Sequence, residues 1–490
     1  MTTRRTFVKG GLASFATLCA ASPATLSTSW ATDSQPDATR RIRAGTPQIF
    51  VDLDGIEPLE NARQSFHAAE KHPDNPVLSG EKPWEAQAYA PTASLIYDEE
   101  EKLFKSWYMG LLGDAAGPTN SYGEHVLCLA TSKDGIHWDR PHLGLHEYEG
   151  SKQNNIVIPA THHEGKDHWE SVQKDPFDSD PQRRYKAFGW TSFPNAAEGS
   201  LQTMTSPDGL HWTHSSGTVV PGGDAQSLMI DAARKRYVLF VRSGPRATYV
   251  SEDFIHWSSP TESLDWKYPG NVYNHMGFAY GDTYLGLVSW YQTHNHHLMD
   301  VRLMSSPDGL RYHLPGADPL SRPALIGMGE VGDWDRMQTR LTGAPPIRVK
   351  DKLYLYYRGF SISHDKEKPP ADNYFAGAIG LATLRLDGFA SLGAGFDGGG
   401  VTTKPIVCEG TKLTINAAAR HHGQVVVEVL DQNGAPIAGY AAAEATPCMA
   451  DSTSQTVRWK SRMDVSELNG RLIRLRFRLV NARLYSYTVT

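Results

Sequence analysis

The chain has 490 residues, with 48 Lys and Arg against 54 Asp and Glu, and 40% of its residues are hydrophobic. A net charge of −6 offers no excess of positive charge for nucleic acid, and no apolar run of about 18 residues predicts a membrane span. At roughly 100–200 residues per domain, the length allows two to four domains, or one large repeat domain with a smaller one.

The N-terminus reads MTTRRTFVKG, so Arg4 and Arg5 stand in the context T-R-R-x-F-x-K. This order fits the twin-arginine export signal, and a weakly apolar segment follows it. Ser-Trp-Ala before Thr32 suits a cleavage site. The sequence therefore predicts a twin-arginine signal peptide over 1–31 and an exported protein, periplasmic or secreted.

Four cysteines occur, and Cys19 lies in the predicted signal. Cys128, Cys408 and Cys448 remain, an odd number without a C-x-x-C motif. A Cys408–Cys448 disulfide is compatible with this pattern, but we expect three buried thiols. Neither outcome indicates a redox centre or a zinc site, and the sequence predicts no cofactor and no metal.

Residues 32–80 are rich in Pro and Asp, and we expect this segment to wrap around the domain that follows. From 81 to 395, short strand-like runs are broken by Gly, Pro and Asp-Gly turns, and helical periodicity is scarce. Examples are YAPTASLIYD (89–98), RYKAFGWTS (184–192), YVLFVRS (237–243) and KLYLYYRG (352–359). Acidic or Pro/Gly turns between these runs indicate antiparallel hairpins.

One turn recurs in this region. It reads SKDGIHW from 132, SPDGLHW from 206, SEDFIHW from 251 and SPDGLRY from 306, and LDGF at 386–389 is a degraded fifth copy. A hairpin before each copy is typical of the four-stranded blades of a β-propeller. We therefore predict an all-β fold with a five-bladed β-propeller over 81–395. The turn would join the third and fourth strands of a blade, with its aromatic residue between blades; a sandwich or another blade count is the alternative.

The C-terminal part has a different pattern. Runs such as GQVVVEVLD (423–431) and LIRLRFRLVNARLYSYTV (472–489) alternate apolar and polar residues, and Asn433-Gly434 marks a hairpin. The sequence predicts a small β-sandwich over 405–490.

Several segments carry a resemblance to a known family. They are HPDNPVL (72–78), EKPWE (81–85), ATSKDGIHW (130–138), DPQRRYKA (180–187) and the C-terminal GQVVVEVLDQNGAPIAGY (423–440). Together they resemble exported bacterial proteins similar to glycoside hydrolase family 32, the invertase and levanase type. The resemblance implies a five-bladed propeller with an appended β-sandwich, and hydrolysis of glycosidic bonds in a poly- or oligosaccharide.

The sequence departs from the invertase pattern at the catalytic motifs. The N-D-P-N-G nucleophile motif and the Glu-Cys acid motif are both missing, while K-D-P at 174–176 is a counterpart of the family's R-D-P. Fructoside specificity is therefore not implied.

In a propeller, the first strand of each blade lines the central channel, so polar residues that open these strands are the site candidates. Glycoside hydrolysis needs one carboxyl as acid and another as base or nucleophile. We predict Glu85 as nucleophile or base, Asp175 as a transition-state carboxylate, and Asp224 or Glu330 as the acid.

The remaining candidates would bind the sugar. They are Trp84, Gln87, Asn274, His275, Asp335 and Arg336. Structural roles compete with several of these assignments: Glu85 fits a turn cap, Asp175-Pro176 fits an Asx turn, and Asp335 fits a blade closure. We interpret Asp98 and Asp231 as hairpin-turn residues.

Two other functions fit the sequence. One is a carbohydrate-binding propeller without catalysis. The other is a polysaccharide lyase, in which His275 takes the proton beside a uronate carboxylate that Arg242 or Arg336 neutralises. The loop HNHH at 294–297 is expected to be solvated or to contact substrate from the rim.

Overall fold

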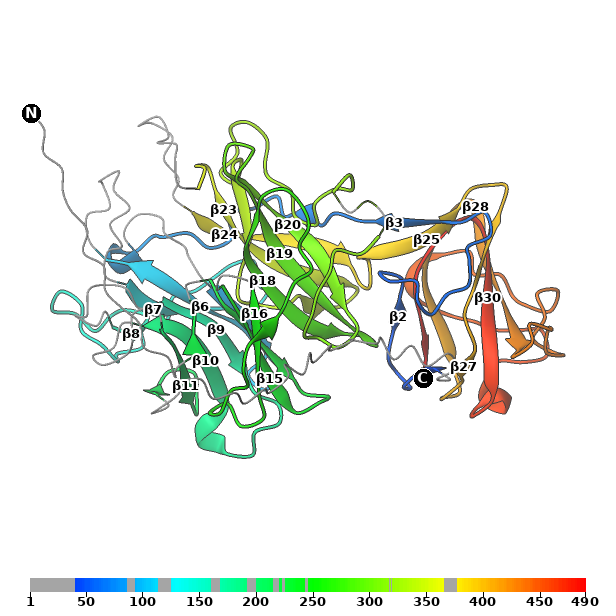
Figure 1. Cartoon of the computed structure of the whole chain (residues 1–490), viewed down its shortest axis with the longest axis horizontal. Helices are drawn as coiled ribbons and strands as arrows, with labels where there is room; N and C mark the ends of the chain where they lie inside the picture. The colour runs from blue at the N-terminus through cyan, green and yellow to red at the C-terminus, as the bar shows by residue number, and fades with distance from the viewer. Residues whose placement is uncertain are drawn as a thin grey trace, which may run out of the picture. The chain divides into compact units, whose positions relative to one another are not determined.

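The computed structural model is all-β, with thirty strands and three short 3-10 helices in the part that it describes (Figure 1). It describes residues 40–85, 93–112, 125–159, 168–191, 200–214, 220–222, 225–242, 246–316, 318, 320–364 and 377–490. The predicted signal peptide lies outside these residues. No helix in the described ranges is long and apolar enough to cross a membrane.

Three sheets of antiparallel strands follow one another in the first half of the chain, and we call them sheets I, II and III. Sheet I contains β5 (Ala93–Asp98), β6 (Leu103–Leu111), β7 (His125–Ser132) and β8 (Ile156–Ile158). Sheet II contains β9 (His168–Lys174), β10 (Tyr185–Thr191), β11 (Ser200–Ser206), β12 (Thr213–His214) and β13 (Val220–Pro221). Sheet III contains β14 (Ser227–Asp231), β15 (Arg236–Val241), β16 (Ala247–Ser251) and β17 (Thr261–Glu262).

The next two groups of strands, sheets IV and V, are joined by a single parallel pair between β20 and β21. Sheet IV contains β18 (Asn271–Tyr280), β19 (Thr283–Gln292) and β20 (Leu298–Ser306). Sheet V contains β21 (Gln338–Leu341), β22 (Ile347–Val349), β23 (Lys352–Phe360), β24 (Ala378–Arg385) and the N-terminal β4 (Glu70–Lys71). The outermost strand of sheet V therefore comes from the start of the chain, where β4 pairs with β24.

Apolar clusters connect each sheet to the next. Trp107 belongs to the cluster between sheets I and II, Phe188 to that between II and III, and Phe240 to that between III and IV. Leu285 lies in the cluster between IV and V, and Tyr356 in one that sheets V and I share. Each sheet thus contacts the next one along the chain, and sheet V contacts sheet I.

The contact between the last and first sheets is specific. The Tyr356 hydroxyl donates a hydrogen bond to the carbonyl of Gly135 at 2.7 Å. The ring of Tyr354 stacks on that of Phe104, with centroids 6.2 Å apart. Sheets V and I are therefore joined by both polar and aromatic contacts.

The repeated turn follows the third strand of sheets I to IV, as predicted. In the first copy, Ser132 Oγ accepts a hydrogen bond from the Gly135 N–H at 2.8 Å, and Asp134 Oδ1 accepts one from the Ile136 N–H at 2.8 Å. Gly135 has a φ of +77°, which favours glycine. The same bonds recur around Asp208, Asp253 and Asp308.

The aromatic residue of the turn packs against the preceding sheet, again as predicted. Trp257 of sheet III lies 5.7 Å from Phe188 of sheet II, and Tyr312 of sheet IV lies 5.5 Å from Phe240 of sheet III, measured between ring centroids. The degraded copy around Phe389 instead leads out of sheet V into the C-terminal sheet.

An aspartate ends the first strand of sheets I, II and III and ties neighbouring sheets together. Asp98 accepts hydrogen bonds from Lys105 of its own sheet at 3.1 Å and from the Tyr185 hydroxyl of the next sheet at 2.9 Å. Burial raises the pKa of Asp98, but the bonds from Lys174, Tyr185 and Lys105 outweigh it and hold this pKa below its usual value. The equivalent sets are Asp175 with Lys186 and Tyr237, and Asp231 with Arg236 and Tyr284.

Serine hydroxyls also connect the first strands of neighbouring sheets, at positions before the aspartates. Ser94 Oγ of β5 accepts a hydrogen bond from the Val172 N–H of β9, and Ser171 Oγ of β9 accepts one from the Leu228 N–H of β14. Ser227 Oγ of β14 donates one to the carbonyl of His275 in β18 at 2.7 Å. The first strands of sheets I to IV therefore lie side by side in chain order.

The C-terminal strands form one nine-stranded sheet around an apolar core that includes Trp459 and Phe477. Its strands are β1 (Arg40–Arg41), β2 (Gln48–Ile49), β3 (Arg63–Phe66), β25 (Ala390–Ala394), β26 (Gly399–Thr402), β27 (Ile406–Val407), β28 (Leu413–Asp431), β29 (Asp451–Thr456) and β30 (Leu472–Val489).

Two boundaries differ from the sequence analysis. The C-terminal sheet begins with β25 at residue 390, because β25 and β26 pair with β30. The segment before residue 80 adds β1, β2 and β3 to this sheet and only β4 to sheet V, so its described part does more than wrap one domain. Cys128, Cys408 and Cys448 are buried free thiols, as expected.

Candidate functional site

Glu85, the predicted nucleophile, lies buried in a network of hydrogen bonds. Its Oε1 accepts bonds from Arg140 Nε at 2.8 Å and from the Tyr108 hydroxyl, and its Oε2 accepts them from the N–H groups of Glu81 (2.8 Å) and Lys82 (3.2 Å). Both oxygens are therefore engaged in holding the turn before sheet I. These bonds favour the capping role of Glu85, and its assignment as nucleophile or base stays a prediction.

Trp84 has a similar structural position. Its indole N–H donates to Asn155 Oδ1 at 2.7 Å, and its ring packs edge-on against Tyr148 at 5.8 Å. The side chain packs with the apolar cluster that sheets V and I share. Trp84 therefore stabilises sheet I, and Gln87 lies outside the described residues.

Asp175 belongs to the repeated set of sheet-joining aspartates. Its carboxylate accepts a hydrogen bond from the Tyr237 hydroxyl at 2.5 Å, pairs with Lys186 Nζ at 3.2 Å, and accepts another from the Phe177 N–H at 2.9 Å. The side chains of Asp175 and Lys186 are both 0% exposed. Both carboxylate oxygens are engaged by sheets II and III, which favours a structural role, and the transition-state role of Asp175 stays a prediction.

The two candidates for the general acid have different outcomes. Asp224 lies outside the described residues. Glu330 is exposed in the loop before β21, where its N–H donates to Asp333 Oδ2 at 2.7 Å. Its carboxylate has the freedom that an acid requires, and its assignment stays a prediction.

Asp335 and Arg336 form structural contacts around sheet V. Asp335 Oδ2 accepts a hydrogen bond from the Tyr357 hydroxyl at 2.8 Å and pairs with Lys71 Nζ at 2.6 Å. Arg336 Nε donates to the carbonyl of Ser361 at 3.2 Å. Asp335 thus joins the N-terminal strand β4 to sheet V, which is the closure role that competed with sugar binding.

The opposite ends of the first strands carry buried polar groups without partners. Gln226, just before β14, is 1% exposed, and both its amide oxygen and its amide nitrogen have no hydrogen-bond partner in the described structure. Asn274 Oδ1 and His275 Nε2 in β18 are also buried and unpartnered. Since most buried polar groups in proteins are satisfied, such a group calls for an explanation, and a bound ligand is one.

His275 is held in its neutral form. Its ring packs edge-on against Phe240 at 5.0 Å, and burial and the positive charge of Arg246 lower its pKa to about 3. An imidazole with so low a pKa is a weak base, so this environment disfavours the proton-abstracting role of His275, which stays a prediction. Its ring faces sheet III, inside the cluster with Phe240.

Arg340 is the most unusual group in this region. It is 4% exposed, and among the described residues no carboxylate pairs with it. Its Nε donates to Gln338 Oε1 at 2.8 Å, and its Nη2 lies 3.1 Å from His364 Nδ1. The guanidinium also stacks 4.6 Å from the ring centre of Tyr273 and 4.5 Å from that of Phe360. A buried cation without a counter-ion is costly, and an anionic ligand would compensate it.

Tyr273 joins this arginine to neighbouring groups. The guanidinium of Arg242, from the end of sheet III, lies 4.8 Å from the centre of the Tyr273 ring. His364 packs edge-on against Tyr273 at 5.0 Å and against Tyr291 at 5.2 Å. Tyr273 and Tyr291 share a small buried cluster with Ala225, the neighbour of Gln226. We call Gln226, Tyr273, Asn274, Tyr291, Arg340 and His364 the inner-strand site.

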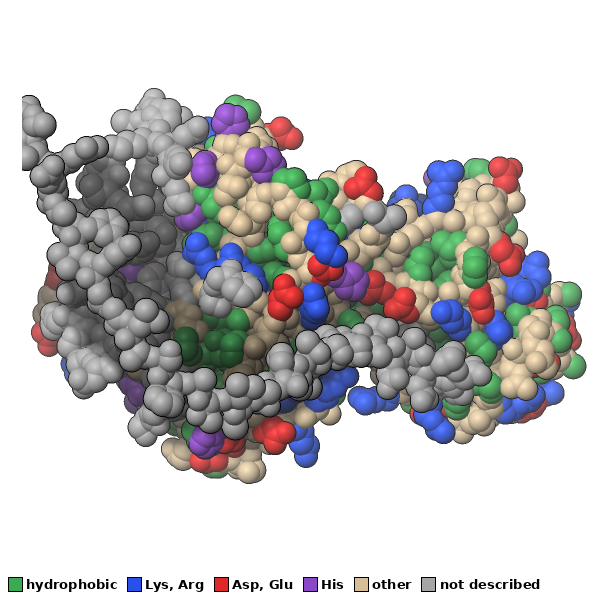
Figure 2. Space-filling model, viewed as in Figure 1, with side chains coloured by type: hydrophobic (Ala, Val, Ile, Leu, Met, Phe, Trp, Pro, Cys, Tyr) green, Lys and Arg blue, Asp and Glu red, His purple; other side chains and the backbone are tan. Residues whose placement is uncertain are grey.

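Histidines border this site at the end of the β19–β20 hairpin, where Figure 2 shows several of them gathered. The Tyr291 hydroxyl lies 2.6 Å from His297 Nδ1, within hydrogen-bond distance. His294 and His296 are exposed. The loop is therefore largely exposed, as expected, and His297 anchors it to the site, while its contact with a substrate stays a prediction.

The sequence analysis found Asn274 and His275 but missed Arg340, Tyr273 and His364. The first strand of sheet V reads QTRL, and an arginine in the middle of a buried strand was the available signal. Among the described residues, no group of three His, Cys, Asp or Glu side chains could hold a metal ion. The site therefore offers cationic, aromatic and amide groups.

No family model matches the chain, and no curated protein matches it. Among solved structures, it is similar to a glycosyl hydrolase from Bacteroides ovatus, with 15% identity, 66% of this chain and 94% of that chain covered, and a TM-score of 0.45. It is also similar to an N-acetylgalactosamine deacetylase from F. plautii in complex with blood group B trisaccharide, with 12% identity, coverage of 68% and 97%, and a TM-score of 0.44.

A beta-1,2-mannobiose phosphorylase from Listeria innocua is similar at 10% identity, with 65% of this chain and 97% of that chain covered and a TM-score of 0.44. At identities of 10–15% and TM-scores of 0.44–0.45, we take neither the activity nor the substrate of this chain from these three proteins.

Proposed function

We propose that this protein is an exported, carbohydrate-active enzyme that cleaves glycosidic bonds in an acidic saccharide. Sheets I to V would form a closed five-bladed propeller, a proposal supported by the cyclic order of their apolar clusters. The inner-strand site would then lie where the first strands of three blades begin. The predicted export signal and the resemblance to glycoside hydrolase family 32 support the same proposal.

The observation that supports an acidic substrate is the environment of Arg340. Its guanidinium is 4% exposed and has no carboxylate partner among the described residues, while Tyr273 covers one face of it. A uronate carboxylate can accept two parallel hydrogen bonds from an arginine, which gives both affinity and orientation. The ring of Tyr273 or Tyr291 would then offer an apolar face to the sugar.

Hydrolysis is our first candidate for the reaction. It needs two carboxyl groups flanking the bond, and the internal ion pairs of Glu85 and Asp175 make these two residues weaker candidates. Asp224 and Glu330 stay as candidates for the acid. Asp224 immediately precedes Ala225, which packs with Tyr273 and Tyr291, so its place in the chain favours it over Glu330.

β-Elimination is the second candidate, because Tyr273 and His364 lie beside Arg340. In this reaction a base takes the proton next to the uronate carboxylate, the bond to the leaving oxygen breaks, and that oxygen gains a proton. Arginine neutralises the carboxylate, which makes the neighbouring proton more acidic. The product carries a carbon–carbon double bond that hydrolysis does not produce.

A substrate screen with a matched variant tests the proposal. Polygalacturonate, alginate and glycosaminoglycans would be compared with neutral glucans and fructans, following new reducing ends and the ultraviolet absorbance of unsaturated uronates. We expect cleavage of an acidic polymer, and in Arg340→Met a fall in kcat/KM of roughly 100-fold or more, as loss of a charge-assisted contact to a buried ligand predicts. Arg458→Met, at an exposed position, should behave as wild type.

Two results would contradict the proposal: cleavage restricted to neutral polymers, or an unchanged kcat/KM in Arg340→Met. The two reactions separate by product, since only elimination creates the absorbing double bond. Thermal unfolding of both variants shows whether a lost activity reflects a lost fold.

A further inference from the structure

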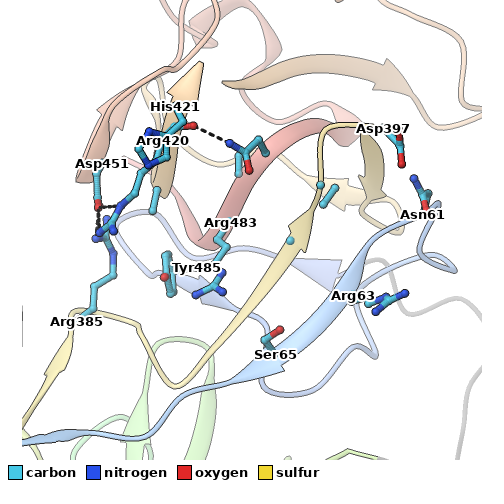
Figure 3. Close-up of a pocket in the computed structure, with 16 residues that line it drawn as sticks. Asn61, Arg63, Ser65, Arg385, Asp397, Arg420, His421, Asp451, Arg483 and Tyr485 are labelled. Carbon is cyan, nitrogen blue, oxygen red and sulfur yellow. Dashed lines mark hydrogen bonds and ion pairs between the residues drawn. The ribbon is translucent and has the colours of Figure 1, made fainter. Parts of the chain in front are cut away.

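A second region of the molecule holds a polar cavity, in the C-terminal sheet and away from the inner-strand site. Its volume is about 760 Å³, within the range of about 300–1,000 Å³ typical of small-molecule sites. Strands β3, β25, β28, β29 and β30 contribute to its walls, and Arg385 at the end of β24 contributes from sheet V (Figure 3).

The cavity has an excess of positive charge. Four arginines line it against two aspartates, so the formal balance is 4 − 2 = +2. Asp451 is already neutralised, because it accepts hydrogen bonds from Arg385 Nη1 at 2.6 Å and from Arg420 Nη2 at 2.8 Å. The second aspartate, Asp397, lies beside Asn61, away from Arg385 and Asp451 (Figure 3).

The other two arginines are unpaired in the described structure. Arg63 of β3 and Arg483 of β30 are both exposed, and no ion pair or hydrogen bond of their guanidinium groups occurs among the described residues. Arg483 acts at a distance on His67, whose pKa is lowered by burial and by this positive charge. These two guanidinium groups are therefore available to a ligand.

The cavity also has an aromatic surface and space beside it. Tyr485 is 8% exposed, and the Arg385 guanidinium lies over its ring, 4.8 Å from the ring centre. Arg483 and Tyr485 are two residues apart in β30, so they project from the same face of the strand. Figure 3 shows them close together, near Ser65 of β3. The walls next to them are glycine and alanine, which leave room.

We propose that this cavity is a second binding site, for an acidic oligosaccharide that carries uronate or sulfate groups. The guanidinium groups of Arg63 and Arg483 would each bind an anionic group, and Tyr485 would contact a sugar ring. The proposal goes beyond the function assigned to the inner-strand site and does not depend on catalysis. The cavity would hold the chain on an acidic polymer.

Calorimetric titration of the full chain with tetragalacturonate tests this site. We compare a double variant that removes the two unpaired arginines, Arg63→Ala with Arg483→Ala, and a control that removes two exposed cations of the same sheet region, Arg458→Ala with Lys460→Ala. The titrations are repeated with Arg340→Met added, so that binding at the inner-strand site is separated. We expect roughly 30-fold weaker binding at the cavity in the first pair and no change in the control.

Equal weakening in both pairs, or no weakening in the first, would overturn the proposal, because it would show general charge attraction or no site. Maltotetraose, a neutral tetrasaccharide, should not bind, and inorganic sulfate should bind far more weakly than tetragalacturonate. Sulfate binding as tight as that of the oligosaccharide would mean a small-anion site instead. A chain that binds at the cavity but cleaves no polymer would disprove only the proposed activity.

Discussion

The two ends of the first strands differ in how their polar side chains are satisfied. At the C-terminal ends, Asp98, Asp175 and Asp231 each bind a basic side chain of the same sheet and a tyrosine of the next. At the N-terminal ends, Gln226 and Asn274 are buried with polar atoms that have no partner in the described structure.

This difference separates structural from functional polarity. A carboxylate whose oxygens are all engaged lowers the free energy of the fold and has nothing left for a ligand. A buried amide without a partner raises that free energy, and a ligand that bonds to it would offset the cost. By the same criterion Glu85 resembles the structural groups, because both of its oxygens accept hydrogen bonds.

The largest expected effect comes from breaking one structural carboxylate. Asp175→Asn removes the charge opposite Lys186, and both side chains are 0% exposed, so we expect a loss of about 3–5 kcal/mol in the free energy of unfolding. Denaturant unfolding measures it. Glu147→Gln, at an exposed position, is the control.

Activity separates the two interpretations of Asp175. Measured per folded molecule at low temperature, kcat should be unchanged in Asp175→Asn. A stable variant with no activity would return Asp175 to the catalytic group and would break the distinction between the two strand ends.

Much of the fold could be predicted from the sequence because its signals are local. The Ser-x-Asp turn, with Gly next in three of its four copies, is stabilised by bonds within six residues, so the copies could be recognised directly. The role of Asp175 was also within reach. Asp98 and Asp231 were interpreted as hairpin-turn residues, and Asp175 takes the same place in its hairpin. In each hairpin the second strand then supplies the basic partner, which is Lys105, Lys186 or Arg236.

The inner-strand site could not be predicted in the same way. What distinguishes Arg340 is that it is buried and lacks a carboxylate partner in the described structure, and both facts depend on neighbours from other sheets. Tyr273 and His364 reach Arg340 from positions far away in the chain. No short motif contains these three residues, so their meeting follows only from the packing of the sheets.

A smaller effect should come from the pH dependence of His275. Its folded-state pKa is lowered to about 3 by burial and by Arg246, while the unfolded chain binds a proton near the ordinary value of about 6.5. The unfolded state thus gains protons first as the pH falls. Stability due to neutral His275 is complete above about pH 6.5 and declines below it, by up to roughly 1.4 kcal/mol per pH unit.

The His275→Leu variant isolates this contribution. Its free energy of unfolding, measured from pH 7 to pH 5, should fall by about 2 kcal/mol less than that of the wild type. His142→Leu, at an exposed position, is the control and should follow the wild-type curve. Parallel curves for His275→Leu and the wild type would mean that His275 titrates normally in the folded protein.

The smallest effect is also the sharpest test of the comparison, because its sign is opposite to that of the others. Gln226→Met keeps the volume of the side chain and removes two buried polar atoms without partners, so we expect the free energy of unfolding to rise by about 1 kcal/mol. Gln338→Met is the matched control in sheet V. Gln338 accepts a hydrogen bond from Arg340 and donates one to the carbonyl of Ile362, so the same substitution should destabilise the fold there.

Substrate binding completes the argument about Gln226. If its amide is kept for a ligand, Gln226→Met should be more stable and should bind the acidic saccharide less tightly, with a raised KM. A variant that is more stable and binds equally well would show that the unpartnered amide serves no ligand. A destabilised variant would show that Gln226 belongs with the satisfied groups at the other strand ends.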